Sequence, residues 1–123
     1  SGSIRIDDVS AAINLDDGSG SIVMNNIGEL TLDDGSGSVV INHAEGNLVL
    51  KDGSGSITID HVNGLVNLVD GSGSIHISQV QGQVTISDGS GSINVNNSKG
   101  LEVVNAGSGS VNYQDIDGPI VVK

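Results

Sequence analysis

The sequence predicts an all-β fold, a single-stranded parallel β-solenoid of about seven coils with 18 residues in each coil. The tetrapeptide Gly-Ser-Gly-Ser occurs six times at intervals of 17 or 18 residues, and each copy is followed by Ile or Val. A shortened copy, Ser1-Gly2-Ser3-Ile4, opens the chain. Within each repeat the apolar residues recur at every second position, which is typical of strands with one buried face. The full copies begin at Gly18, Gly35, Gly53, Gly71, Gly89 and Gly107.

Two strands are expected in each repeat. With the first glycine as position one, alternating runs cover positions four to eight and thirteen to seventeen, which are residues 56–60 and 65–69 in the third full repeat. A third short side is expected around positions ten to twelve. A helix is excluded because the apolar spacing is two and glycines interrupt every window.

Stacked coils are favoured over antiparallel hairpins, because a meander has no reason to keep one repeat length. In a stack, equivalent residues lie about 4.8 Å apart. A left-handed hexapeptide helix needs an apolar residue at every sixth position, and this sequence lacks that pattern. The usual sense of parallel crossovers therefore favours a right-handed solenoid.

The sixth coil departs from the pattern, because Ser98 and Glu102 occupy positions that are apolar in other repeats. A buried carboxylate without a partner is costly. We therefore expect a local shift that turns Leu101 and Val103 inward. In the last coil Tyr113 replaces an aliphatic residue and is expected to form a partial lid over the open end.

Composition restricts the partners. The 123 residues form a single repeat domain, residues 1–123, which we interpret as a processed form or a piece of a longer protein. The net charge is −11 with only four Lys and Arg, so a nucleic-acid or anionic-membrane partner is not expected. No apolar run approaches the roughly 18 residues of a spanning helix, so membrane insertion is not expected either.

An aspartate precedes five of the Gly-Ser-Gly-Ser turns. The first interpretation is structural, with each carboxylate accepting hydrogen bonds from the turn. The alternative is calcium binding between coils, since carboxylates at a glycine-rich turn suit a hard cation; no other cofactor is expected. The candidate Ca²⁺ ligands are Asp17, Asp34, Asp52, Asp70 and Asp88.

The Gly-Ser-Gly-Ser segments are expected to present two columns of outward serine hydroxyls. The glycine between them would face inward, and would either make room for a facing leucine or adopt backbone angles that other residues avoid. Such hydroxyl columns resemble the Thr-x-Thr arrays of ice-binding solenoids. The candidate binding-face residues are Ser19, Ser21, Ser36, Ser38, Ser54, Ser56, Ser72, Ser74, Ser90 and Ser92.

Other polar columns are interpreted structurally. Position eight includes Asp7, Asn25 and Asn42, whose side chains are expected to hydrogen-bond along the stack. His43 and His61 share position nine and should stack one coil apart, at a solvated corner. A metal site there would have only Asp60 as an obvious third ligand.

The repeat Gly-Ser-Gly-Ser-Ile-x-Ile followed by Val-x-Gly-x-Val-x-Leu-x-Asp, seen from Gly53 to Asp70, resembles a family of bacterial cell-envelope domains classed as adhesins. The resemblance covers nearly the whole chain. It implies a right-handed β-solenoid, an exported protein in the periplasm or at the cell surface, and an adhesive or scaffolding role. It carries no catalytic residues.

The leading functional prediction is a non-enzymatic scaffold or adhesin-like module that presents a flat sheet face to an unidentified surface or protein. No catalytic triad, phosphate-binding loop or metal cluster is recognisable, so an enzyme is not expected. The alternatives are ice binding through the serine columns and calcium-dependent adhesion. Without visible caps the ends are expected to favour end-to-end association of copies.

Overall fold

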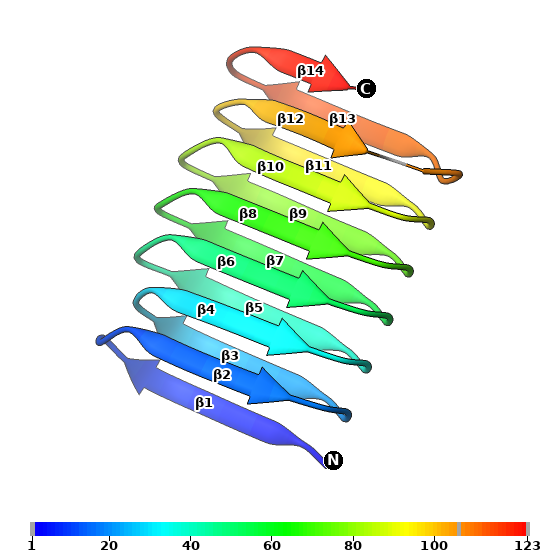
Figure 1. The fold of residues 1–123 in the computed structure, drawn as a ribbon. Coiled ribbons are helices and arrows are strands. Elements are labelled where there is room, and N and C mark those ends of the chain that lie inside the picture. The colour runs from blue at the N-terminus through cyan, green and yellow to red at the C-terminus, as the bar shows by residue number, and fades with distance from the viewer. Residues whose placement is uncertain (1, 106, 123) are drawn as a thin grey trace.

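Each coil contributes one strand to each of two seven-stranded parallel sheets (Figure 1). The structure is a computed structural model that describes residues 2–105 and 107–122. The first sheet contains β1 (Ile4–Val9), β3 (Ile22–Ile27), β5 (Val39–Ala44), β7 (Ile57–Val62), β9 (Ile75–Val80), β11 (Ile93–Ser98) and β13 (Val111–Ile116). The second contains β2 (Ile13–Asp17), β4 (Leu30–Asp34), β6 (Leu48–Asp52), β8 (Val66–Asp70), β10 (Val84–Asp88), β12 (Leu101–Asn105) and β14 (Ile120–Val122). The predicted parallel β-solenoid is confirmed.

The coils stack in the register that the repeat predicts. Ile57 pairs with Ile75, and Ile59 pairs with Ile77. The backbone ladder continues into the turns, where the Gly71 amide donates to the Asp52 carbonyl at 2.9 Å. The two expected strands are present in each coil, and the third short side, which the sequence left open, is not formed in the described residues: a short bend connects the strands there.

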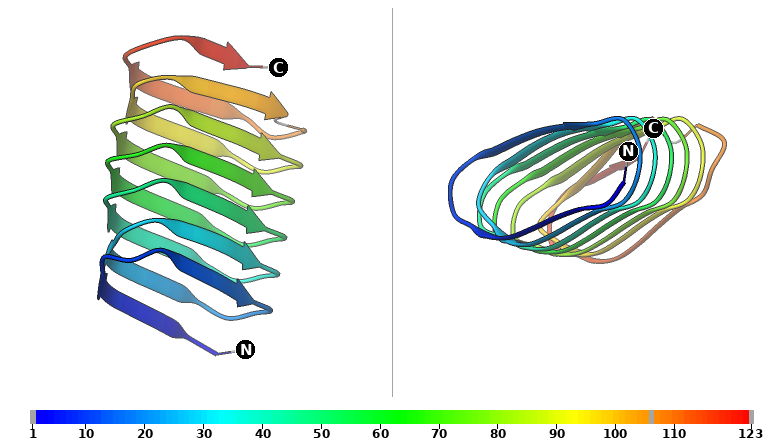
Figure 2. Two further views of the ribbon diagram at one scale, coloured as in Figure 1. Left: turned by 60° about the vertical axis from the view of Figure 1, so that its left-hand side comes forward. Right: turned by 90° about the horizontal axis from the view of Figure 1, so that it is seen from below.

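The core is a continuous column of aliphatic side chains between the sheets. Seen along its axis, the solenoid is a flattened ring whose two long sides are the sheets (Figure 2). In the middle coils Ile59 and Val62 of the first sheet and Leu68 of the second are all fully buried. Burial of such side chains contributes about 1.5–3 kcal/mol each, so the core depends on many coils together.

The predicted shift in the sixth coil is confirmed. Leu101 and Val103 are fully buried, whereas Glu102 faces outward beside Thr85. Ile86 pairs with Val103 and Ser87 pairs with Asn105, so the ladder skips Val104, and this bulge absorbs the change of phase. Ser98 still points inward, and its hydroxyl donates to the Gly100 carbonyl at 3.0 Å, so the buried oxygen is satisfied.

A left-handed residue explains why the apolar spacing changes within the first-sheet strands. The residue at position nine has a φ of 55° to 66° in every coil. It is skipped by the ladder, which pairs Asp60 with Ser78 and then Val62 with Val80. Positions eight and nine therefore both face outward, and position ten returns to the core. These residues are Asp8, Asn26, His43, His61, Gln79, Asn97 and Asp115.

The last coil leaves apolar side chains in contact with solvent. Tyr113 is 49% exposed, whereas its neighbour in register, Val95, is buried. Ile120 and Val122 are similarly exposed. End-to-end association stays a prediction. Among the described residues, no helix is long and apolar enough to cross a bilayer.

The third residue of each Gly-Ser-Gly-Ser turn must be glycine. Of the two expected reasons, the backbone angles that other residues avoid are the one that holds. Gly73 has a φ of +116°, and a Cβ atom on it would lie 1.9 Å from the carbonyl oxygen of Gly55 in the preceding coil. The oxygen belongs to the backbone and the Cβ atom would be bonded directly to the backbone, so no side-chain rotation can relieve the overlap.

We expect Gly73→Ala to lower the free energy of unfolding by about 3 kcal/mol or more, through backbone strain and this collision. Gly18→Ala is the matched control, because a Cβ atom there meets nothing within 4 Å. It should change stability by no more than about 0.5 kcal/mol. Denaturant titrations of both variants make the comparison, and equal effects would contradict this account of the turn.

Candidate functional site

The five aspartates predicted at the turns point into the solenoid. Strand β4 alternates inward Leu30 and Leu32 with outward residues, and Asp34 continues the inward series. Asp52 and Asp70 lie directly in register. From Asp34 to Asp88 these residues are only 1% to 3% exposed, and Asp17 is 9% exposed. The Leu-x-Leu-x-Asp alternation already carried the signal for this burial.

Most of these carboxylate oxygens have no hydrogen-bond partner. Both oxygens of Asp34, Asp52 and Asp70 are buried and unpartnered. The expected turn hydrogen bond is formed at Asp88, whose Oδ1 accepts from the Ser90 amide at 3.3 Å. The structural interpretation therefore holds in part: the carboxylates lie at the turns, but the turns do not satisfy them fully.

Burial dominates the electrostatics of this column. Burial, together with the charges of neighbouring aspartates, raises the pKa of Asp52 to about 6 and that of Asp70 to about 7. The turn amides of Gly71 and Ser72 act in the opposite direction on the pKa of Asp70. Burial likewise raises the pKa values of Asp34 and Asp88. A protonated carboxyl group both donates and accepts, so protons can satisfy oxygens that the turns leave unpaired.

The column has no obvious centre for calcium. Its members follow one another along the axis rather than surrounding a point. Within residues 2–105 and 107–122, no group of three or more His, Asp or Glu side chains is arranged to hold a metal ion. Calcium binding by these aspartates stays an untested hypothesis.

The predicted serine columns lie at the narrow edge of the solenoid and not on a flat sheet. The Ser72-Gly73-Ser74 segment is a bend between β8 and β9, with Ser72 half-buried and Ser74 exposed. The first serine of most turns is half-buried in the same way, and the second is exposed in most of them. A flat hydroxyl array, which the comparison with ice-binding solenoids requires, is therefore not formed by these segments.

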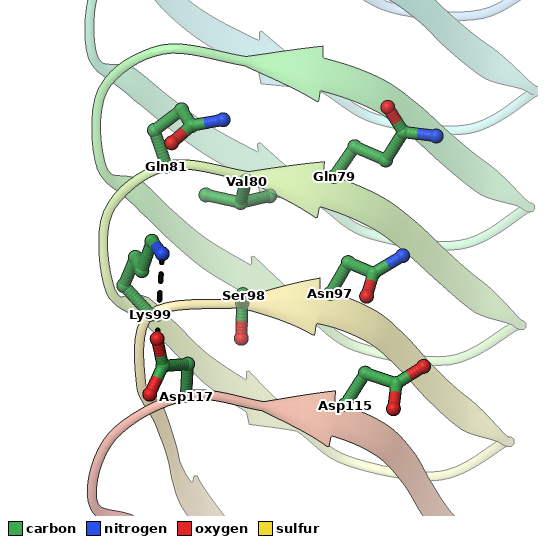
Figure 3. A pocket seen from close by; sticks show the side chains of 8 residues that line it. All are labelled: Gln79, Val80, Gln81, Asn97, Ser98, Lys99, Asp115 and Asp117. Carbon is green, nitrogen blue, oxygen red and sulfur yellow. Dashed lines mark hydrogen bonds and ion pairs between the residues drawn. The ribbon is translucent and has the colours of Figure 1, made fainter.

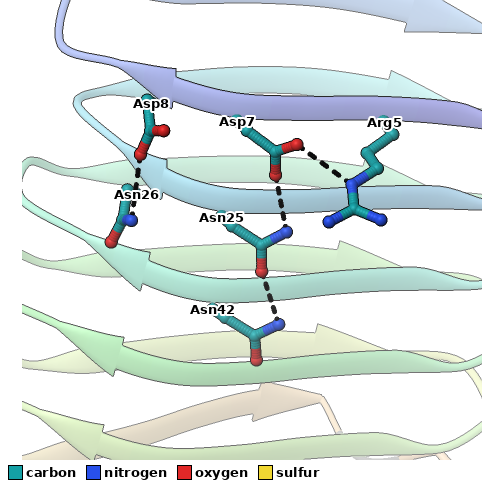
Figure 4. Close-up of polar contacts among 6 residues, drawn as sticks. All are labelled: Arg5, Asp7, Asp8, Asn25, Asn26 and Asn42. Carbon is teal, nitrogen blue, oxygen red and sulfur yellow. Dashed lines mark hydrogen bonds and ion pairs between the residues drawn. The ribbon is translucent and has the colours of Figure 1, made fainter.

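The outer face of the first sheet carries the polar ladder that position eight predicts. Asn25 Nδ2 donates to Asp7 Oδ1 at 2.7 Å, and Asn42 Nδ2 donates to Asn25 Oδ1 at 2.9 Å (Figure 4). Further along the stack the Ser78 hydroxyl donates to Asp60 Oδ1 at 2.9 Å. The hydrogen bond from Asn25 and the one from Arg5 lower the pKa of Asp7. These contacts fix outward side chains from coil to coil.

Sequence reasoning missed a furrow along the corner where the first sheet ends. We call it the corner trough: beside β9, β11 and β13 it is lined by residues at positions nine and eleven of three successive coils and by position ten of two of them. It has a volume of about 310 Å³, and Ser98 is one of its lining residues (Figure 3). The trough depends on the left-handed backbone conformation at position nine. The sequence did not reveal this conformation, because the residue types at position nine are varied. The trough is lined by Gln79, Val80, Gln81, Asn97, Ser98, Lys99, Asp115 and Asp117.

The predicted stacking of the two histidines is confirmed. His43 and His61 lie one coil apart at position nine, with ring centroids 6.4 Å apart. Asp60, the expected third neighbour, pairs with His61 Nδ1 at 3.1 Å. His76 is separate from them and lies exposed on the outer face of the first sheet.

Comparisons with protein-family models, with curated proteins and with solved structures gave no match. The resemblance to bacterial envelope adhesin domains therefore rests on the repeat motif alone.

The buried aspartates predict an unusual dependence of stability on pH. Their pKa values are raised in the folded protein, so the folded state binds protons more tightly than the unfolded chain. Stability should be greatest below about pH 4 and should fall as pH rises through about 7. For Asp70 alone the loss between pH 5 and pH 8 should be about 2 kcal/mol.

We expect Asp70→Asn to be more stable than the parent at about pH 8 and to lose part of this pH dependence. Asp115→Asn, which changes an exposed carboxylate away from the column, is the control and should keep the full dependence. Urea midpoints measured across this range test both variants. A parent protein that gains stability with rising pH would contradict the buried-carboxylate account.

Proposed function

We propose that this protein is a non-enzymatic scaffold or adhesin-like module of the bacterial cell envelope, which contacts its partner through the outer face of the first sheet. The observation that carries the proposal is the distribution of charge. On strands β3 to β13 the outward positions six, eight and nine contain two carboxylates, Asp60 and Asp115, and no Lys or Arg. This is unusual in a chain with a net charge of −11.

A face with few charges suits contact with another molecule, because the centres of protein interfaces are depleted in charged residues. The second sheet carries outward charges of both signs, since its outward residues include Asp33, Lys51 and Glu102. The ladders at Asn25, Asn42 and Ser78 also hold the first face in a fixed conformation. Such preorganisation reduces the entropy that binding would cost.

The same face offers hydrogen bonds as well as a flat surface. Near its C-terminal end a shallow hollow of about 180 Å³ is lined by amide side chains together with His76 and Tyr113. Amides both donate and accept, so this surface suits a polar partner such as a glycan or a backbone edge. The resemblance to envelope adhesin domains points in the same direction.

Binding to isolated bacterial cell-envelope fractions and to glycan arrays tests the proposal. We expect Thr58→Arg, at the centre of the first face, to reduce binding at least tenfold, because it places a long charged side chain in the contact. Asn67→Arg, in the corresponding part of the second sheet, is the matched control and should bind like the parent. Equal losses, or no binding to any envelope component, would contradict the proposal. Thermal hysteresis would favour the ice-binding alternative instead.

A further inference from the structure

The two stacked histidines at position nine are the surface feature of the solenoid with the most specific chemistry. His43 and His61 occupy the same left-handed position in adjacent coils, and their ring centroids are 6.4 Å apart. Their side chains are 42% and 53% exposed, so the rings are open to solvent. The backbone beneath them is fixed by the ladder between β5 and β7.

Each ring is held by a carboxylate through one nitrogen only. His43 Nε2 pairs with Glu45 Oε1 at 2.5 Å, and His61 Nδ1 pairs with Asp60 Oδ1 at 3.1 Å. Glu45 is itself held, because its second oxygen accepts from Asn63 at 2.7 Å. The ring protons lie on the carboxylate side in this arrangement, and His43 Nδ1 and His61 Nε2 keep their lone pairs.

This is the outer-shell pattern of metal-binding histidines, which donate one ring N–H to a carboxylate and coordinate the metal through the other nitrogen. We propose that His43 and His61 together bind a divalent transition-metal ion, with Zn²⁺ as the ion to test. Imidazole nitrogen suits Zn²⁺, Ni²⁺ and Cu²⁺ better than Ca²⁺ or Mg²⁺. The negative charge of Glu45 and Asp60 favours a cation at this position.

The two imidazole rings must move closer together to share one metal ion. With Zn–N distances of about 2.0–2.1 Å and tetrahedral angles, two imidazole centroids lie about 5 Å apart. The rings must therefore approach by about 1 Å, which side-chain rotation of half-exposed residues can supply. No three-residue metal cluster exists among the described residues, so water completes the coordination sphere and the site is a weak one.

Calorimetric titration of Zn²⁺ into the tag-free chain at about pH 7.5 tests the site, since the neutral imidazole is the ligand. We expect one Zn²⁺ per chain, with affinity reduced at least tenfold by either His43→Asn or His61→Asn. Asparagine already occupies this left-handed position at Asn26 and Asn97, so both variants should fold. His76→Asn is the matched control and should bind Zn²⁺ like the parent.

Two further measurements separate a shared site from binding at a single histidine. Glu45→Gln should weaken binding about tenfold while leaving both nitrogens in place, because it removes the outer-shell carboxylate. On adding Zn²⁺, the ring ¹⁵N resonances of His43 and His61 should shift at the same metal equivalence while those of His76 stay unchanged. The proposal is overturned if His76→Asn weakens binding as much as His61→Asn, if only one of the two rings responds, or if both variants bind normally.

Discussion

Parallel stacking of the backbone in register is the constraint on which the rest of this structure depends. Equivalent residues of successive coils lie about 4.8 Å apart, so each side chain has its own counterparts above and below it. Gly73 illustrates how strict this is, because its α-carbon faces the Gly55 carbonyl so closely that a single methyl group cannot be added. The repetition in the sequence is a direct consequence, because each residue must fit against the residues at the same position in the coils above and below it.

Stacking also places like charges together. The column from Asp17 to Asp88 runs inside the wall, and repulsion between neighbouring carboxylates adds to the cost of burial. On the outer surface the same proximity allows hydrogen bonds between adjacent coils: Asp7 accepts a hydrogen bond from Asn25, and Glu45 accepts one from Asn63. One geometric rule therefore produces a protonatable column inside the solenoid and hydrogen-bonded ladders on its surface.

Much of the fold could be predicted from the sequence, because the repeat reports the register directly. The two strands of each coil, the inward turn of Leu101 and Val103 and the stacking of His43 on His61 all follow from position and alternation. The missing third side and the corner trough could not be predicted so easily. Both depend on a backbone angle at position nine, where residues as different as His61 and Gln79 share one left-handed conformation.

The burial of the aspartates was predictable in principle but was masked by their chemistry. Asp34 continues the inward phase of Leu30 and Leu32, yet an acidic residue beside a glycine turn is normally assigned to the surface. The raised pKa values resolve this conflict, because a carboxyl group that keeps its proton is far less costly to bury than its ion. The alternation was the better guide because it follows from backbone geometry, to which the side-chain chemistry then adapts.

In a repeat protein of this kind, columns that keep their residue type maintain the stack, and departures from the type create local chemistry. The glycine and aliphatic columns allow few exceptions, since each exception would disturb two neighbouring coils. Position nine is less restricted, because its side chain points outward and the ladder omits it. It therefore accommodates the histidines that face Glu45 and Asp60. Distinctive sites are thus expected where the repeat is broken at positions that the backbone does not need.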